Sequence, residues 1–290
     1  MAAFPDEQVE GLRRAPPTTG GAGETMMNMQ EKIALIVGGS YGIGKATAQA
    51  FAEAGAKVVI AARGVEQGEL TAAEIVRGGG EATFIPADVS RPGDVANLIA
   101  QTVSVYGRLD CAFNNAASVR GAGALTAAFA EAEFDDVMAT NLKGVWLCMK
   151  HEIRQMLQQQ PAGGTIVNTS SINGLGGTPG AALYSASKAG VLALTKSAAQ
   201  EYAGEGIRVN ALVPGAFRTP MLEGVMRRIA GADAEALAQV EARYQELAPL
   251  QRIGSPAEAA AAVLWLCSDA ASYVTGHSLI VDGGATAYAR

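Results

Sequence analysis

Histidine and cysteine are scarce in this sequence of 290 residues. The two histidines, His151 and His277, lie far apart, so a zinc site, which needs several His or Cys ligands, is not expected. The three cysteines are an odd number and form no Cys-x-x-Cys pair, which argues against a disulfide scaffold and favours a reducing compartment, the cytoplasm. We expect Cys111, Cys148 and Cys267 to behave as small buried hydrophobic residues.

Charge and long apolar runs are also limited. Lys and Arg total 22 and Asp and Glu total 28, which gives a net charge of −6. Without a basic excess, neither nucleic acid nor an anionic membrane surface is expected as a partner. No window offers about 20 uncharged apolar residues in succession, so the sequence predicts no transmembrane helix.

Hydrophobic residues, in contrast, make up 49% of the chain, and glycine occurs 35 times. This composition suits a large buried core, with glycines at tight turns and close backbone approaches. The start of the chain differs, because Arg13–Thr25 is rich in Pro, Gly and Thr and shows no periodicity. We predict a flexible tail over 1–29, without the apolar segment of a secretory signal, and one domain over 30–290. An organellar transit peptide and a natural start at one of the methionines near the end of this tail are alternatives.

Within the domain, seven short apolar runs alternate with amphipathic stretches. The runs are continuously apolar, which is typical of strands covered on both faces. The repeated strand–helix order predicts an α/β fold, namely a single-domain, doubly wound (Rossmann-type), mostly parallel seven-stranded sheet with helices on both faces. The predicted strands are Ile33–Val37, Lys57–Ala62, Ala82–Pro86, Leu109–Asn114, Thr165–Thr169, Arg208–Val213 and Ser278–Val281, and the predicted helices span about 43–54, 65–77, 92–106, 131–158, 182–203 and 256–268.

A glycine-rich loop follows the first predicted strand and leads directly into a helix. Its spacing is Gly-x-x-x-Gly-x-Gly, which differs from the better-known Gly-x-Gly-x-x-Gly fingerprint. Glycines let the backbone turn sharply and approach a diphosphate, and the free N–H groups at a helix start favour phosphate. This pattern predicts a dinucleotide site, while an ordinary strand–helix turn is the alternative. The predicted contacts are Gly38, Ser40, Tyr41, Gly42, Ile43 and Gly44.

The second predicted strand ends in Ala62 and Arg63, about 20 residues after the loop. A site specific for NAD usually places a carboxylate there to bind the ribose 2′-hydroxyl, whereas a guanidinium can pair with a 2′-phosphate. Arg63 therefore favours NADP(H) as the cofactor, with NAD(H) as a second possibility. A solvated arginine at a strand end is the alternative interpretation, since the glycine loop adds no basic residue of its own.

A tyrosine and a lysine are four residues apart in the motif Tyr-Ser-Ala-Ser-Lys, at the start of a predicted helix. This spacing puts Tyr184 and Lys188 on one helical face, about 6 Å apart along the axis. A free tyrosine has a pKa of about 10 and is a poor base at neutral pH. A nearby ammonium, together with the positive charge of a nicotinamide, would lower that pKa and allow proton exchange with a substrate oxygen. A plain amphipathic helix start with surface Ser and Lys is the alternative.

Several such motifs occur in order over about residues 32–285. They are the glycine loop, Asp88-Val89, Asn114-Asn115-Ala116, a Ser171 placed 13 positions before Tyr184, Tyr-Ser-Ala-Ser-Lys, Pro214-Gly215 and Ser278–Gly284. Each motif alone is weakly specific. As an ordered set, they resemble the short-chain dehydrogenase/reductase family.

The resemblance implies four catalytic residues. Tyr184 would be the general acid/base, Lys188 would bind the nicotinamide ribose and lower the tyrosine pKa, and Ser171 would polarise the substrate oxygen. Asn141 would support a water linked to the lysine. The resemblance also implies cofactor contacts by Asp88 and Val89 at the adenine, Asn115 at the adenosine ribose, Thr219 at the carboxamide or phosphates, and Pro214 and Gly215 just before it.

Two positions depart from the family pattern. Val37 replaces the threonine that usually precedes the first glycine, and Ala117 replaces the glycine that usually follows Asn-Asn-Ala. The first change removes a hydroxyl that often ties the loop to a neighbouring strand, and the second adds a methyl near the nicotinamide. We expect some loss of loop order without loss of activity.

Two segments carry apolar residues at helical spacing whose partner is not given by the sequence. After Thr219, apolar residues recur at helical spacing from Leu222 to Ile229, which fits either a packed helix face or a lid over an apolar substrate. The predicted helices 131–158 and 182–203 are apolar on more than one side, and a surplus of this kind usually means a partner. Because similar proteins pair these helices across a two-fold axis, a homotetramer is expected.

These features together predict an oxidoreductase that moves a hydride between a nicotinamide and a carbonyl or secondary alcohol. The substrate would be a small molecule, and the loops 117–125, 173–183 and 216–250 offer no clear handle for charge, which favours an apolar carbonyl, alcohol or diol. A 3-oxoacyl thioester is a further possibility. The alternatives are a dehydratase or epimerase on the same scaffold and a non-catalytic nicotinamide-binding scaffold or sensor.

Overall fold

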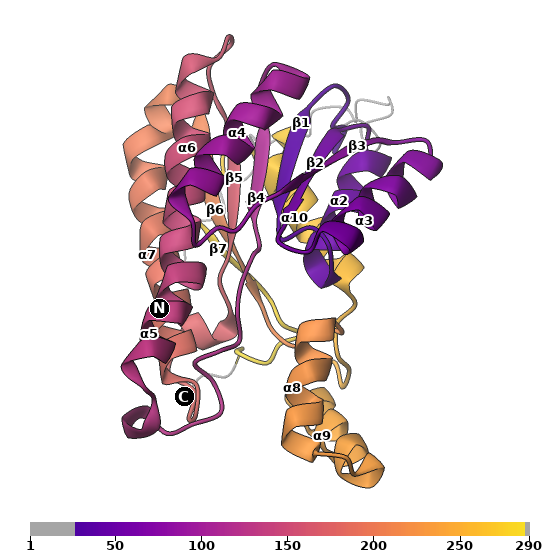
Figure 1. Cartoon of the computed structure of the whole chain (residues 1–290), viewed down its shortest axis with the longest axis vertical. Helices are drawn as coiled ribbons and strands as arrows, with labels where there is room; N and C mark the ends of the chain where they lie inside the picture. Colours follow the sequence, from indigo (N-terminus) through magenta and orange to yellow (C-terminus); the bar gives the residue numbers. More distant parts are fainter. Residues whose placement is uncertain (1–26, 288–290) are drawn as a thin grey trace, which may run out of the picture.

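The computed structural model describes residues 27–287 and has a parallel sheet at its centre (Figure 1). The strand order is β3-β2-β1-β4-β5-β6-β7, as the predicted doubly wound fold requires. Strand boundaries agree with the predictions to within about two residues. The strands are β1 (Ile33–Val37), β2 (Lys57–Ala62), β3 (Glu81–Pro86), β4 (Cys111–Asn114), β5 (Gly164–Thr169), β6 (Ile207–Pro214) and β7 (Ser278–Val281).

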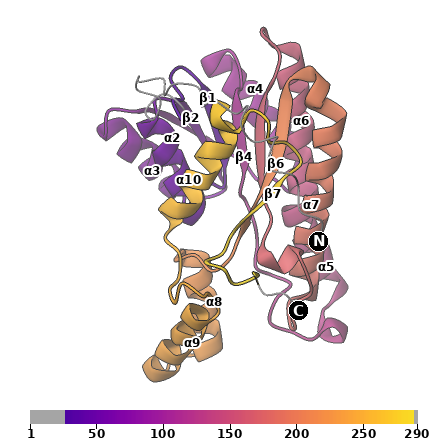
Figure 2. The same ribbon diagram turned by 180° about the vertical axis from the view of Figure 1, so that it is seen from behind.

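Helices cover both faces of this sheet, as Figures 1 and 2 show. Alternate residues of a strand point to opposite faces, so Leu35 joins the core on one side and Ile36 the core on the other. All five residues of β1 are buried, which explains its unbroken apolar sequence. One face carries α4 (Pro92–Tyr106), α6 (Gly144–Gln158) and α7 (Ala182–Tyr202), and the other carries α2 (Gly42–Glu53), α3 (Val65–Arg77) and α10 (Pro256–Cys267).

The strand order reverses beside β1. From β1 the chain proceeds outward to β2 and β3, then returns to β4 on the other side of β1. Connections therefore leave in opposite directions at the carboxyl ends of β1 and β4. In doubly wound sheets the ligand crevice lies at this point, and the predicted site residues other than Asn141 are on the loops, helix starts and strand ends nearby.

The predicted helix over 131–158 is not one regular helix. α5 (Glu131–Met138) and α6 are joined by a π-helical segment, Ala139–Lys143, in which the N–H of Gly144 bonds to the carbonyl of Ala139. Such segments are frequent at functional sites. Apolar periodicity predicted one continuous helix and did not reveal this segment.

Two helices, α8 (Pro220–Ala230) and α9 (Ala234–Glu246), follow β6. α8 covers the segment from Leu222 to Ile229 whose apolar residues recur at helical spacing, whereas α9 was not predicted. Each begins with a capping side chain, because Thr219 accepts a bond from the N–H of Leu222 and Asp233 accepts bonds from the next helix. The pair extends beyond the carboxyl end of the sheet (Figures 1 and 2). Its own small core joins the two helices through Leu222, Met226, Ala230, Leu237, Val240, Tyr244 and Ile253.

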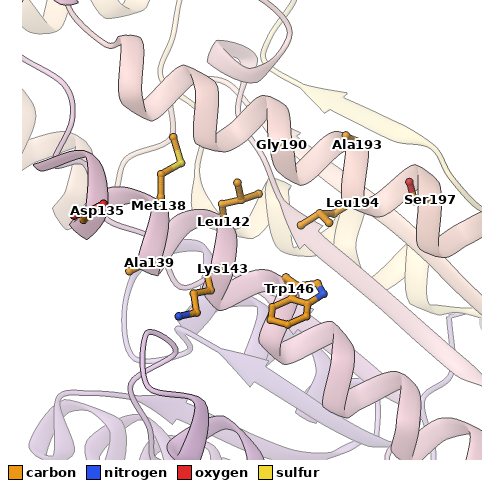
Figure 3. A pocket seen from close by; sticks show the side chains of 10 residues that line it. All are labelled: Asp135, Met138, Ala139, Leu142, Lys143, Trp146, Gly190, Ala193, Leu194 and Ser197. Atoms are coloured by element: carbon orange, nitrogen blue, oxygen red, sulfur yellow. The ribbon is translucent and has the colours of Figure 1, made fainter. Parts of the chain in front are cut away.

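An apolar hollow of about 710 Å³ lies on the outer side of α6 and α7 (Figure 3). Leu142 and Trp146 line it from the π-helical segment and α6, and Leu194 faces them from α7. Trp146 is 44% exposed. This hollow is distinct from the carboxyl edge of the sheet, and none of the predicted site residues lines it.

The ends of the domain and the cysteines complete the comparison with the sequence. Most of the predicted tail, residues 1–26, lies outside the described residues, but Met29 is buried and its N–H bonds to the carbonyl of Ala54. The domain therefore includes Met29, just before the predicted boundary. All three cysteines are free and buried, as predicted. In residues 27–287 no helix has the length and apolar character that crossing a bilayer demands.

Candidate active site

The glycine loop turns tightly between β1 and α2. Gly38 has a φ of 80°, and a Cβ there would lie 2.7 Å from the backbone nitrogen of Ala116. A Cβ at Gly44 would lie only 2.0 Å from the carbonyl oxygen of Gly38. Any side chain at either position would collide with backbone, so the loop requires glycine at both.

The start of α2 is suited to an anion. Its N-cap residue, Tyr41, makes no side-chain capping bond, and the first turn contains no acidic residue. The first N–H groups and the positive end of the helix dipole are thus available to a phosphate. Ser40 is buried and Tyr41 is exposed beside this turn. These residues fit the diphosphate of a dinucleotide, which is the group the sequence predicted here.

A second helix start meets the first. A Cβ at Gly42 would lie 2.9 Å from the Cγ2 atom of Thr219, the N-cap of α8. The structure therefore brings Thr219 to the glycine loop from a position 177 residues later in the chain. Gly215 lies at the end of β6, where a Cβ would be 2.7 Å from the Cβ of Asp282, so glycine is needed for this turn.

Asn115 ties the glycine loop to the neighbouring strands. Its Nδ2 donates to the carbonyl of Gly38 at 3.3 Å, and its Oδ1 accepts a bond of 3.1 Å from the Thr169 hydroxyl. The side chain of Val37, the first departure from the family pattern, is packed in the core. Asn115 thus supplies a connection between the loop and β5 that does not require a hydroxyl at position 37.

Arg63 and Asp88 follow the ends of the paired strands β2 and β3. Burial acts to raise the pKa of Asp88, but two bonds from Ser90 and the charges of Arg63 and Arg91 outweigh it and hold this pKa below its usual value. Arg63 itself is exposed at the strand end. The side chain of Val89 packs against Gly144 in the core, where a Cβ on that glycine would lie 2.8 Å from it.

The three predicted proton-transfer residues converge at the ends of β5 and the start of α7. The Nζ of Lys188 lies 5.8 Å from the centre of the Tyr184 ring and donates a 2.8 Å hydrogen bond to the carbonyl oxygen of Thr169. The Ser171 hydroxyl interacts with that of Tyr184. Lys188 is 1% exposed, so its ammonium is fixed by backbone and excluded from water.

The pKa values in this group are set by burial. Burial raises the pKa of Tyr184, and the interaction with Ser171 opposes this rise. Burial also lowers the pKa of Lys188 to about 8. The expected lowering of the tyrosine pKa by the lysine is therefore not a property of the protein chain alone.

Asn141 lies in the π-helical segment and is fully buried. Its Oδ1 accepts a bond of 2.7 Å from the N–H of Ser118, and its Nδ2 donates to the Ser118 carbonyl at 2.9 Å. The same Nδ2 donates to the Ser187 hydroxyl at 3.3 Å, which in turn donates to the carbonyl of Tyr184 at 2.7 Å. Asn141 thereby connects the loop after β4 to the first turn of α7.

Three residues that support the site were not predicted. The main-chain carbonyl of Thr169 accepts a hydrogen bond from the Lys188 ammonium, and the Ser170 hydroxyl donates to the Lys188 carbonyl at 2.8 Å. The Ser187 hydroxyl accepts from Asn141 and donates to the carbonyl of Tyr184. The run of hydroxyls after β5 and inside the tyrosine motif was the available signal. Sequence alone did not show that the Thr169 carbonyl would accept a bond from Lys188, nor which carbonyls the Ser170 and Ser187 hydroxyls would meet.

Comparisons with known proteins agree with this geometry. The family model described as enoyl-(acyl carrier protein) reductase matches residues 37–286. The chain is 41% identical over 262 residues to 2,5-dichloro-2,5-cyclohexadiene-1,4-diol dehydrogenase of Sphingobium indicum, covering 90% of this chain and 100% of that protein.

Solved structures show the same relationship. The crystal structure of levodione reductase matches with a TM-score of 0.84 and 37% identity, covering 89% of this chain and 99% of that one. A variant of actinorhodin polyketide ketoreductase with NADPH matches with a TM-score of 0.83 and 34% identity, covering 89% and 98%. The sheet order, the ordered motifs and these matches lead to one conclusion: the chain belongs to the short-chain dehydrogenase/reductase family and is an oxidoreductase that acts on alcohol or carbonyl groups.

Proposed function

We propose that this oxidoreductase transfers a hydride between C4 of a nicotinamide and the carbon of a ketone or secondary alcohol, with Tyr184 as the general acid/base. The observation that carries the proposal is the meeting of Ser171, Tyr184 and Lys188 at the sheet edge that also holds the glycine loop. The bound cofactor supplies or accepts the hydride, and the protein controls orientation and the proton.

In the reducing direction, the substrate oxygen gains negative charge as the hydride reaches its carbon. The Tyr184 hydroxyl donates its proton to this oxygen, and the Ser171 hydroxyl donates a hydrogen bond to the same oxygen. In the oxidising direction, the phenolate accepts the proton from the alcohol. Because burial raises the pKa of Tyr184, the phenol is the resting form in the chain alone, which suits a proton donor.

Lys188 acts beside the tyrosine. Its buried ammonium, held on the Thr169 carbonyl, stabilises a phenolate at Tyr184 and offers further N–H donors to the nicotinamide ribose. Asn141 acts as a positioning residue in this proposal, because its bonds to Ser118 and Ser187 hold the first turn of α7.

The proposed cofactor is NADP(H), with NAD(H) as the weaker alternative. The glycine loop and the uncapped start of α2 fit the diphosphate, with Thr219 beside them. Arg63 is an exposed cation at the end of β2, where a 2′-phosphate would lie. One structural neighbour was solved with NADPH, which supports the same preference.

The proposed substrate is a small apolar ketone, secondary alcohol or diol. The loops flanking Tyr184 contain few charged groups, and a relative with 41% identity is named as the dehydrogenase of a cyclic diol. The α8–α9 pair stands over the carboxyl edge of the sheet and would complete the substrate side of the site.

We also propose that the enzyme is a homotetramer. The apolar hollow between α6 and α7 exposes Trp146, Leu142 and Leu194, and a second copy of the same face would cover them (Figure 3). The strand β7 lies at one edge of the sheet with Ile280 43% exposed, which gives a second apolar surface for assembly. The free, buried cysteines support a reducing compartment, the cytoplasm.

The test is a panel of cyclic and acyclic ketones and alcohols, each assayed with NADPH or NADP⁺ and with NADH or NAD⁺. We expect oxidation of NADPH by at least one apolar ketone and a slower rate with NADH. Binding of NADPH without turnover of any ketone or alcohol would overturn the proposal and favour a sensor or scaffold.

A further inference from the structure

A carboxyl group is fully buried in the core at a distance from the proton-transfer residues. Glu152, on α6, is 0% exposed. Its Oε2 accepts a 2.9 Å hydrogen bond from Nδ2 of Asn114 at the end of β4. No Lys, Arg or His within residues 27–287 forms an ion pair with it. An ionised carboxylate in this position would be buried without a counter-ion, which is energetically unfavourable.

Two oxygen atoms of Glu152 and Asn114 indicate that a proton is present between these side chains. Oδ1 of Asn114 and Oε1 of Glu152 are both buried, and neither has a hydrogen-bond partner in the described part of the chain. As long as Glu152 is ionised, both atoms are acceptors and cannot bond to each other. A proton on Oε1 converts one of them into a donor, and a planar acid and a planar amide can then form two parallel hydrogen bonds.

We propose that Glu152 is protonated on Oε1 at neutral pH and donates a hydrogen bond to Oδ1 of Asn114. The two side chains then form a cyclic acid–amide pair, which makes Glu152 a positioning residue for the strand ends beneath the active site. The second hydrogen of Asn114 Nδ2 is already used, in a 3.0 Å bond to Oδ1 of Asn168. The acid thus fixes the orientation of the Asn114 amide, and the amide fixes that of Asn168.

Asn114 and its partner Asn168 each immediately precede, in the sequence, a residue that contacts the proposed site. Asn114 precedes Asn115, which bonds to the glycine loop. Asn168 precedes Thr169, whose carbonyl accepts the Lys188 ammonium. The row continues into α7, because Nδ2 of Asn168 donates to Oγ1 of Thr195 at 3.0 Å. The cyclic pair therefore fixes both β4 and β5 where they support the site.

The surroundings of Glu152 keep the acid neutral. Burial raises its pKa to about 8, opposed in part by the Asn114 bond. Cys148, one turn earlier on α6, is its titratable neighbour, and burial raises the pKa of that thiol well above its usual value, so it remains uncharged. The hydrogen-bonded neighbours are amides, Asn114 and Asn168, and the core shared by α4 and α6 is apolar, with Val95, Leu98 and Ile99 from α4 and Met149 from α6.

The sign of the pH dependence follows from linkage. The pKa of Glu152 is raised from about 4.3 in the unfolded chain to about 8 in the fold. Between these two pKa values the folded state holds a proton that the unfolded state has lost. The contribution of this proton to the free energy of unfolding is therefore largest below the pKa of the unfolded chain. That contribution decreases as the pH rises toward about 8 and changes no further above it.

The first test compares melting temperatures of the full chain and of Glu152→Gln between pH 5 and pH 9. Glutamine can form both bonds of the pair without a titrating proton. We expect the melting temperature of Glu152→Gln to rise by several degrees relative to wild type between pH 5 and pH 8, with a constant difference at higher pH. Glu69→Gln, an exposed change of equal charge on α3, should show no such trend. A difference between Glu152→Gln and wild type that is independent of pH would overturn the proposal.

The second test detects the proton directly in the wild-type protein, and the variants serve only to assign the band. Infrared spectroscopy should show the C=O stretching band of a protonated carboxylic acid in the wild-type protein at neutral pH. This band should be lost as the pH passes about 8, and should be absent from Glu152→Gln but present in Glu69→Gln. Absence of the band from wild type at neutral pH would overturn the proposal.

The positioning role has its own measurement. Glu152→Ala leaves Asn114 without its partner, and we expect at least a fivefold weaker NADPH affinity by fluorescence titration, restored to within twofold by Glu152→Gln. Equal affinity in all three proteins would show that the pair does not position the site. This arm rests on the proposed cofactor, whereas the melting and infrared tests need neither cofactor nor turnover.

Discussion

Lys188 donates its 2.8 Å hydrogen bond to the main-chain carbonyl of Thr169, at the end of β5, rather than to a carboxylate. Among residues 27–287 no acidic side chain forms an ion pair with this ammonium, so its positive charge is available to Tyr184 and to a bound cofactor. Because no acidic partner offsets the cost of burying this ammonium, burial lowers the pKa of Lys188 to about 8.

The first prediction concerns the pH dependence of ketone reduction. Because the folded pKa of Lys188 lies below the usual lysine value, its ammonium is lost as the pH rises through about 8. We expect kcat/KM for reduction to fall over that range in wild type. Lys188→Met should lose about 10²-fold or more at neutral pH and should lack this falling limb. A wild-type profile that stays level well above pH 8 would refute the assignment.

The second prediction concerns Tyr184. Tyr184→Phe removes the proton donor and keeps the ring, so kcat should decrease by about 10²- to 10⁴-fold. NADPH affinity should change little, as measured by fluorescence titration. Tyr273→Phe makes the same change at a fully exposed tyrosine and should behave as wild type. Retained turnover in Tyr184→Phe would assign the proton to another group.

The third prediction uses the crowding of the glycine loop. Gly44→Ala places a methyl 2.0 Å from the Gly38 carbonyl, so the loop must shift. We expect a loss of about 1–3 kcal/mol in the free energy of unfolding and a raised KM for NADPH. Gly93→Ala, in the first turn of α4, serves as the control, because within residues 27–287 no atom beyond its chain neighbours and the local helix backbone lies within 4 Å of the added methyl. Similar urea denaturation midpoints for both variants would contradict the crowding argument.

The fourth prediction concerns cofactor selection. A charged hydrogen bond contributes about 1.5–3 kcal/mol, so Arg63→Ala should reduce the preference for NADPH over NADH by about tenfold or more. Arg77→Ala, at the end of α3, removes an arginine of the same charge away from the end of β2. The ratio of kcat/KM values for the two cofactors is the measurement. If Arg63→Ala leaves that ratio unchanged, Arg63 is only a solvated strand-end residue.

The fifth prediction concerns assembly. Leu194→Glu introduces a charge into the apolar hollow on α7, so light scattering should show a smaller particle than the tetramer proposed for the wild type. Glu201→Gln on the exposed part of α7 should leave the mass unchanged. A wild-type protein that is a stable monomer would refute the tetramer.

Much of the fold could be predicted because apolar runs are direct consequences of burial. β1 is buried along its whole length and was readily predicted. For α8 only the helical spacing from Leu222 to Ile229 was recognised, and α9 was missed, although Thr219 and Asp233 are ordinary N-cap residues. These two helices pack chiefly on each other, and their local signals were less prominent than the strand–helix rhythm of the sheet. The π-helical turn at Asn141 could not be predicted from the local sequence, because the partners of its side chain, Ser118 and Ser187, are far away in the sequence.

The site was predictable in part. Tyr184 and Lys188 are one helical turn apart, so their proximity follows from helix geometry. The contact of Thr219 with Gly42 depends on how β6 and β1 are placed in the sheet, which no local pattern encodes. The same is true of the cyclic pair proposed for Glu152 and Asn114, which lie 38 residues apart.

The separate core of the α8–α9 pair has a consequence for how this enzyme can diversify. Met226 and Val240 pack within the pair and not in either of the two cores that hold the sheet. Substitutions there can reshape the substrate side proposed for this helix pair without requiring compensating changes around Tyr184 or the glycine loop. Libraries randomised in these two helices should therefore yield many folded members with altered selectivity.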